Sequence, residues 1–154
     1  IKVFDTTLLM MWECHFTANE AMHGGGVYAE HTSPVTAYDS MWEMNGAMMW
    51  GAGVMVTTES PLVLTGCHFM ENNANMTGGG VYAQNSSSIT AMTSQWHENT
   101  ASENGGGIAT GKSIMVHLTE CMFGNNAAMM NGGGVYVADN CEVTAMKTSW
   151  TDNV

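Results

Sequence analysis

The sequence contains no arginine and three lysines, against 14 aspartates and glutamates, which gives a net charge of −11. Proteins that bind nucleic acid or anionic membranes neutralise phosphates with clustered Lys and Arg. This chain lacks such clusters, so we exclude nucleic acid as a partner. It also lacks the run of about 18 apolar residues that a membrane-spanning helix requires. We therefore expect no membrane span in this segment.

Helical periodicity is missing as well. Apolar residues do not recur at i, i+3, i+4 and i+7, and glycine triplets interrupt the chain throughout. They alternate instead, as in "SSITAMTSQW" at 87–96, which is typical of short strands. With 154 residues, 45% of them apolar, the chain is long enough for one all-β domain with a core.

What the chain has in abundance is glycine, in triplets that begin every 27 residues. The triplets are Gly24–Gly26, Gly51–Gly53 (with Ala52 at its centre), Gly78–Gly80, Gly105–Gly107 and Gly132–Gly134. A phosphate-binding loop occurs once in a domain, whereas a repeat of about 20 to 50 residues indicates a solenoid, a propeller or an array. We interpret each triplet as a corner, where glycine supplies positive φ and lets neighbouring coils approach closely.

Two further columns keep this period after a first interval of 26 residues. The aromatic column is Phe16, Trp42, Phe69, Trp96, Phe123 and Trp150. An asparagine follows each aromatic by three residues, at Asn19, Asn45, Asn72, Asn99, Asn126 and Asn153. We predict that the rings stack inside the solenoid and that the asparagines form a ladder of amides bonded to the coils above and below. Asparagine suits a turn there because it tolerates left-handed geometry.

The size of the ring is matched by a second column, five residues earlier. That column reads Met11, Ala37, Leu64, Ala91, Leu118 and Ala145, so Trp coils carry Ala and Phe coils carry Leu or Met. Interiors are close-packed, so a larger ring requires a smaller neighbour. We infer that both positions share one interior volume and that the full period is two coils.

These columns predict an all-β fold, a right-handed parallel β-helix of about 27 residues per coil, five to six coils and two or three short strands per coil. A propeller blade needs about 40 residues, and the leucine pattern of leucine-rich repeats is missing. We expect residues 1–154 to form a single β-helix segment, part of a longer chain or filament.

The four cysteines do not make a disulfide framework. Cys14, Cys67 and Cys121 lie in alternate coils, about 9.6 Å apart at the strand spacing, and a disulfide needs Cα atoms within about 7 Å. We expect all three to be unpaired and buried. Cys141 stands in a different column, and its only conceivable partner within a coil is Cys121. The cysteines therefore leave the redox compartment open.

Catalytic and metal-binding patterns were sought and none was assigned. The four aspartates do not share a column, and a chain without Arg has little with which to bind a uronate. His15 and His68 each follow a cysteine, but adjacent strand residues face opposite sides and cannot converge on one ion. Paired methionines at 10–11, 48–49 and 129–130 lie apart, and Glu98 and Glu103 offer only an unspecific calcium site. We expect no catalytic residue, no metal and no cofactor.

Two sequons flank one glycine corner. They begin at Asn75, in "NMT", and at Asn85, in "NSS". We expect both asparagines in exposed turns, where N-glycosylation would be feasible in a secreted protein.

The combination of "FxxN" with a "GG-small-aliphatic" tetrapeptide resembles the repeats of polymorphic outer membrane proteins, a family of bacterial surface autotransporters. It is also similar to right-handed β-helix repeats of secreted and surface proteins of bacteria, algae and protists. The motifs here run from "FTAN" to "WTDN" and pair with "GGGV" or "GGGI". Two features depart from the family pattern: the third glycine replaces its usual alanine, and Trp replaces every second Phe.

The resemblance implies stalks, adhesins and fibre bodies rather than one chemistry. We expect a non-catalytic structural protein of an extracellular filament or cell-surface stalk that packs end to end with further coils or subunits. One alternative is an adhesin or glycan-binding surface passenger, for which glycans would be the partner. Another is a polysaccharide lyase or hydrolase whose site lies outside this segment.

Overall fold

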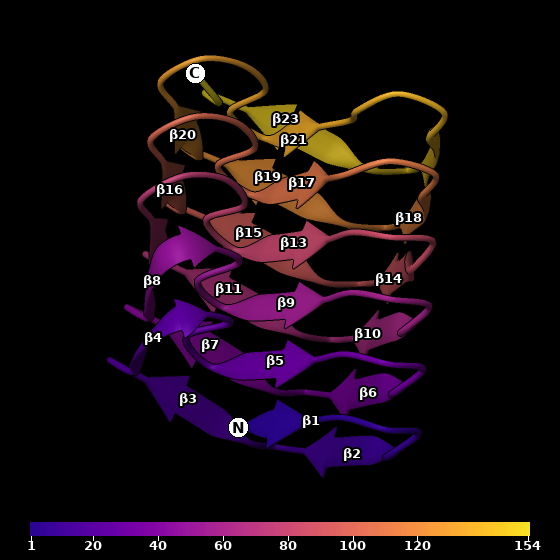
Figure 1. The fold of residues 1–154 in the computed structure, drawn as a ribbon. Helices are drawn as coiled ribbons and strands as arrows, with labels where there is room; N and C mark the ends of the chain where they lie inside the picture. Colours follow the sequence, from indigo (N-terminus) through magenta and orange to yellow (C-terminus); the bar gives the residue numbers. More distant parts are fainter.

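The computed structural model describes all of residues 1–154 and is a stack of coils (Figure 1). The chain climbs from the N-terminus at the base to the C-terminus at the top, and each coil lies directly on the one before it. Every strand pairing is parallel. The predicted parallel β-helix is therefore confirmed.

The 23 strands fall into four parallel sheets, here named A to D. Sheet A contains β1 (Lys2–Val3), β5 (Val27–Ala29), β9 (Val54–Val56), β13 (Val81–Ala83), β17 (Ile108–Thr110) and β21 (Val135–Tyr136). Sheet B contains β2 (Leu9–Trp12), β6 (Val35–Tyr38), β10 (Leu62–Thr65), β14 (Ser88–Met92), β18 (Met115–Thr119) and β22 (Glu142–Met146). Sheet C contains β3 (His15–Thr17), β7 (Met41–Glu43), β11 (His68–Met70), β15 (Gln95–His97), β19 (Met122–Gly124) and β23 (Ser149–Thr151). Sheet D contains β4 (Glu20–His23), β8 (Gly46–Trp50), β12 (Asn73–Ala74), β16 (Thr100–Ala101) and β20 (Ala127–Ala128).

The prediction of two or three strands per coil is wrong, because sheet D adds a fourth. Three of its strands are only two residues long. Alternation of polar and apolar residues needs at least four residues to be visible, so a two-residue strand carries no such signal. Its pairing is imposed by the coils on either side.

The register follows the period of the sequence. Phe69 pairs with Trp96, and Trp96 pairs with Phe123, each 27 residues further along the chain. In the first pair of coils the interval is 26, with Phe16 opposite Trp42. An irregularity between β4 and β8 restores the longer interval, after which the two coils keep the common register.

The corners depend on left-handed backbone conformations, and only some of them use glycine. The first glycine of each triplet has positive φ, as at Gly78 (φ 74°). At the Asn column, however, the left-handed residue is the one before each asparagine, such as Glu71 (φ 52°) and Glu98 (φ 54°). Our explanation of that column by the asparagine's own left-handed geometry is therefore wrong. The asparagine is fixed by its side-chain hydrogen bonds instead.

The third glycine of the triplet has a different role, which is close approach. A Cβ on Gly80 would lie 2.6 Å from the carbonyl oxygen of Gly107 and 2.7 Å from Cδ1 of Trp96. The ring of each coil packs against this glycine, so no side chain fits. This contact accounts for the departure from the family's usual alanine at that position.

A core of 24 buried residues runs the length of the solenoid. The size-matched column lies wholly inside it, since Leu64 and Ala91 are 0% exposed and Leu118 is 1% exposed. These residues face one another across the register of sheet B, Leu64 opposite Ala91 and Ala91 opposite Leu118. The prediction that large and small residues alternate within one interior volume is confirmed.

Candidate functional site

The six rings of the aromatic column form one continuous stack in sheet C. Successive centroids are between 4.4 and 5.3 Å apart and successive planes lie within 11° of parallel. Trp42, Phe69, Trp96 and Phe123 are buried, whereas Trp150 is 46% exposed. Offset stacking at such distances adds about 0.5–1.5 kcal/mol per pair beyond the burial of area. The stack therefore ties each coil to the next.

The two buried tryptophans carry a cost with them. The indole Nε1 atoms of Trp42 and Trp96 are buried and have no hydrogen-bond partner. A buried donor without an acceptor costs about 1–3 kcal/mol. The large apolar area and the stacking of these rings offset that cost.

The asparagine ladder lies beside the rings and is buried through the central coils. Asn72 accepts at Oδ1 from both the backbone N–H (3.1 Å) and the side-chain Nδ2 (2.9 Å) of Asn45. Its own Nδ2 donates to Oδ1 of Asn99 (2.9 Å) and to the carbonyl oxygen of Trp42 (2.9 Å). The same pattern of Asn-to-Asn bonds repeats from Asn19 to Asn153. Each amide is thus bonded to the coil above and to the coil below.

A second polar ladder, which the sequence analysis did not identify as one, contains the cysteines. The backbone N–H of Cys67 donates to Oγ of Ser94 (3.1 Å), and that of Cys121 donates to Oγ1 of Thr148 (3.4 Å). All four cysteines are free, as predicted for the first three. Burial raises the pKa of the Cys67 and Cys121 thiols, which keeps them protonated and unreactive.

The fourth cysteine belongs to another polar column. The Sγ atom of Cys141 accepts from the backbone N–H of Ile114 at 3.2 Å. In earlier coils the same bond is made by serine, with Ser60 donating to Oγ of Ser87 at 3.1 Å. Cys141 therefore replaces a structural serine, and its Sγ bonds locally rather than to Cys121.

Both sequon asparagines lie on the surface, on opposite sides of the corner at 78–80. Asn75 is exposed, and the hydroxyl of its sequon partner Thr77 reaches the Glu103 carboxylate at 3.3 Å. Asn85 is exposed with φ 55°, and its Nδ2 lies 3.3 Å from Oγ1 of Thr57. The acceptor amide is therefore reachable from solvent at both positions.

The structure brings no metal-ligating set together. No group of three or more His, Cys, Asp or Glu side chains is close enough to hold an ion. Cys67 is buried while His68 is partly exposed, because they face opposite sides of sheet C. Met48, Met129 and Met130 are exposed singly or as neighbours in loops. The structure also contains no helix long and apolar enough to cross a membrane.

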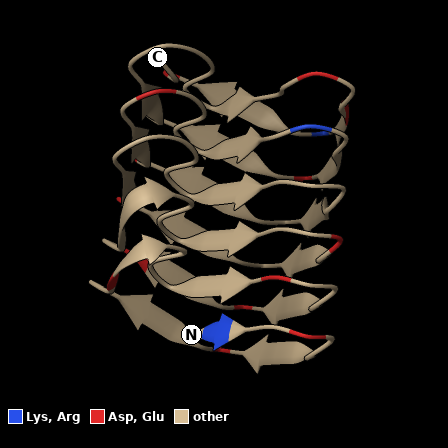
Figure 2. Ribbon diagram, in the orientation of Figure 1, with Lys and Arg blue, Asp and Glu red and all other residues tan.

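Charged side chains are few and concentrate at the turns, which leaves the strand faces largely uncharged (Figure 2). One cluster is near the base, where Lys2 lies 2.8 Å from Glu30 and the Tyr28 hydroxyl donates to Glu30 at 2.7 Å. These two bonds hold the pKa of Glu30 below its ordinary value. Burial, together with the bond to Glu30, raises the pKa of Tyr28 to about 12.

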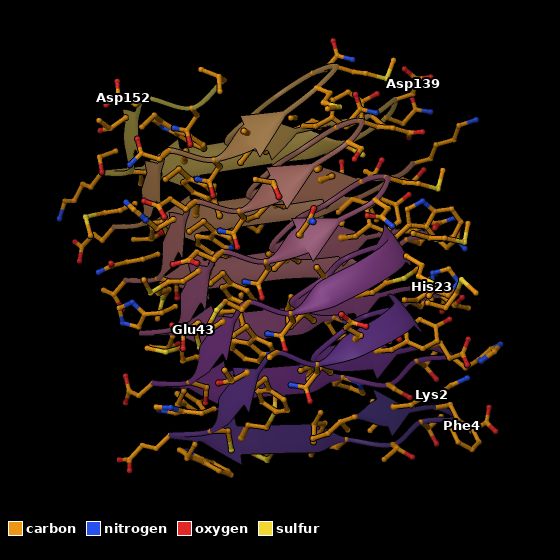
Figure 3. The ribbon with its side chains drawn as sticks, turned by 90° about the vertical axis from the view of Figure 1, so that its left-hand side faces the viewer. Lys2, Phe4, His23, Glu43, Asp139 and Asp152 are labelled. Carbon is orange, nitrogen blue, oxygen red and sulfur yellow. The ribbon has the colours of Figure 1, made fainter.

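The outer wall carries an aromatic column of its own, which our reading of the sequence missed. Tyr28, Tyr82 and Tyr136 occupy one outward position of sheet A, in alternate coils. His23 stacks on Trp50 beside them, with centroids 5.0 Å apart (Figure 3). The signal was present in the sequence as a tyrosine that follows the core valine at the same period of two coils. We followed only the inward columns and so did not find it.

The chain belongs to the right-handed β-helix family. Residues 9–123 match the family described as "Right handed beta helix region", in agreement with the predicted hand of the solenoid. No curated protein matches the sequence, and no solved structure matches it.

Proposed function

We propose that this chain is a non-catalytic structural protein of an extracellular filament or cell-surface stalk. The observation that carries the proposal is the unbroken asparagine ladder, which runs through six coils from Asn19 to Asn153. The aromatic stack runs beside it over the same coils. Such columns make the solenoid stiff along its axis, which is the property that a stalk or fibre body requires.

The partner that suits these columns is another set of coils. One face of the Trp150 ring stacks on Phe123, yet 46% of the residue stays exposed. An apolar ring of this size is stabilised when a further coil covers its free face. We propose that such coils, from the same chain or from another subunit, pack end to end with this segment.

The extracellular or cell-surface location is supported by the likeness of the "FxxN" and "GGGV" motifs to the repeats of polymorphic outer membrane proteins. The low content of basic residues also fits a surface that repels anionic membranes and nucleic acid. Within the right-handed β-helix family, this likeness favours the surface stalk over the enzymes that share the fold.

Immunogold electron microscopy of intact, unpermeabilised producing cells tests the proposal. Gold from an antibody raised against residues 1–154 should lie along filaments or stalks outside the envelope. Cells in which the gene is deleted should lack both the label and the filament. An antibody against a cytoplasmic protein serves as the control for intact cells. Label that appears only after permeabilisation, or filaments unchanged in the deletion strain, would contradict the proposal.

A further inference from the structure

A hollow of about 390 Å³ touches the stack at Trp150, but a second hollow of about 350 Å³ has the lining of a binding site. It lies outside sheet A, across β13, β17 and β21, in the upper half of the stack (Figure 1). Its lining includes Tyr82, Gln84, Asn104, Gly111, Lys112 and Tyr136. Ligand pockets have volumes of about 300–1,000 Å³, so the size suits a small ligand. We call it the sheet A groove.

The groove exists because one coil carries small residues where its neighbours carry large ones. The outward position next to the strand end reads Glu30, Thr57, Gln84, Gly111 and Ala138 in successive coils. A Cβ on Gly111 would already lie 3.1 Å from Cγ of Gln84 and 3.2 Å from the Tyr82 hydroxyl. A longer side chain at this position would therefore extend into the groove.

The tyrosine position shows the same contrast between coils. Between Tyr28 and Tyr82 the intervening residue is Met55, which is 3% exposed and fills the space. Between Tyr82 and Tyr136 it is Ala109, which fills much less. The two phenol rings therefore border a hollow in the upper coils that the lower coils do not have.

The lining offers hydrogen-bond donors without partners beside these rings. The Gln84 amide and the Lys112 ammonium make no hydrogen bond or ion pair within the protein. Asn104 accepts at Oδ1 from Nδ2 of Asn131 (2.8 Å), which leaves its own Nδ2 free. Burial raises the pKa of Tyr82, so its hydroxyl remains a neutral donor and acceptor.

The charge of the groove points to an uncharged ligand. Lys112 is its one cation, in the loop after β17 (Figure 2). The Glu103 carboxylate lies on the rim, 3.3 Å from the Thr77 hydroxyl. With one charge of each sign nearby and a net charge of −11 on the chain, the site does not favour an anion.

From this lining we infer that the sheet A groove binds one pyranose unit of a neutral carbohydrate. A pyranose presents C–H groups on its faces and hydroxyls around its rim. The phenol rings of Tyr82 and Tyr136 suit the faces, and the free amides of Gln84 and Asn104 with the Lys112 ammonium suit the hydroxyls. This inference concerns the outer wall and is independent of the proposed structural role.

The test is binding of neutral sugars to the chain produced in a bacterial host without N-glycosylation, because a glycan on Asn85 would lie at the groove. Saturation-transfer NMR and titration calorimetry with glucose, galactose, mannose and N-acetylglucosamine should identify at least one that binds. Gly111→Gln, which places in this coil the residue that Gln84 supplies one coil below, should weaken that binding by about tenfold or more. Val63→Gln, on the outer face of sheet B, is the matched control and should leave it unchanged.

A second pair of variants guards against loss of folding. Tyr136→Ala and Gln84→Ala alter partly exposed side chains, and the urea midpoint of each variant reports whether it still folds. Both should weaken binding while Val63→Gln does not. No binding of any neutral sugar at millimolar concentration, binding of acidic sugars only, or equal binding by all folded groove variants would each overturn the inference.

Discussion

Trp96 and Phe123 lie face to face, with ring centroids 4.7 Å apart and planes 3° from parallel, although a whole coil separates them in sequence. The indole needs more room than the phenyl ring, and the interior supplies it through Ala91, which stands where the next coil has Leu118. The stack is regular because the residue beside each ring compensates for its size.

We first predict that ring and neighbour are energetically coupled. Trp96→Phe alone should lower the free energy of unfolding by about 1–2 kcal/mol, because it leaves a cavity. Ala91→Leu alone should lower it by about 1–3 kcal/mol through overpacking. The double variant recreates a Phe–Leu coil and should recover most of the loss. Urea denaturation of all four proteins measures this cycle, and additive effects of the two changes would contradict a shared volume.

The asparagine ladder gives a second prediction with a control at the adjacent position. Asn72→Ala removes the acceptor of the buried Asn45 backbone N–H and the donor to the carbonyl oxygen of Trp42. We expect a loss of about 2–4 kcal/mol in unfolding free energy, because a buried polar group is left without a partner. Asn73→Ala alters an exposed residue of the same turn and should change stability by less than about 0.5 kcal/mol. Similar losses in the two variants would mean that the buried amide has no special role.

The glycine corner gives a third prediction. Gly80→Ala places a Cβ between the carbonyl oxygen of Gly107 and the ring of Trp96, and should cost about 3 kcal/mol or more. Gly46→Ala is the matched control, since its Cβ would meet only Cγ of Glu20 at 3.5 Å, an ordinary contact. That change should be neutral or slightly stabilising. Thermal or urea unfolding of both variants decides, and an undisturbed Gly80→Ala protein would disprove the close approach.

Burial of thiols and phenols predicts sensitivity to alkali. The pKa values of Cys67, Cys121, Tyr28 and Tyr82 are all raised, in each case first by burial. The folded protein therefore holds these protons at pH values where the unfolded chain releases them, at about 8.5 for thiols and about 10 for phenols. Their contribution to stability is complete below those values and declines as the pH rises through the folded-state pKa values.

The measurement is the urea midpoint between about pH 8 and pH 11, which should fall steadily over this range. Cys67→Ala combined with Cys121→Ala should flatten its first part, near the thiol pKa, whatever the change in absolute stability. Thiol labelling at neutral pH provides an independent check, since Cys67 and Cys121 should react much more slowly than the partly exposed Cys14. A midpoint that stays constant to pH 11 would refute the assignment.

The sequence predicts the architecture well because each inward column must satisfy the same interior in every coil. Phe69, Trp96 and Phe123 could be placed over one another from spacing alone, and so could Leu64 and Ala91. Features set by neighbouring coils were not predictable in this way. The left-handed conformation of Glu98 has no signal in its residue type, and the two-residue β16 is a strand only because β12 and β20 pair with it.

The candidate binding surface was less predictable than the core. Tyr82 and Tyr136 repeat with the period of the solenoid, but a period does not say whether the space between two side chains is filled. That depends on Ala109 and Gly111, and on how far the Tyr82 hydroxyl leans over the next coil. Only the positions of the side chains determine it.

The central claim, that successive coils stack in register with their rings face to face, is tested most directly by aromatic nuclear Overhauser spectroscopy. Protein carrying labelled Phe and Trp rings should give strong cross-peaks from Trp96 to both Phe69 and Phe123, whose centroids lie 5.2 and 4.7 Å away. Phe69→Leu and Phe123→Leu variants identify the two signals. Trp96 cross-peaks to neither phenylalanine, in protein that is otherwise folded, would contradict the account.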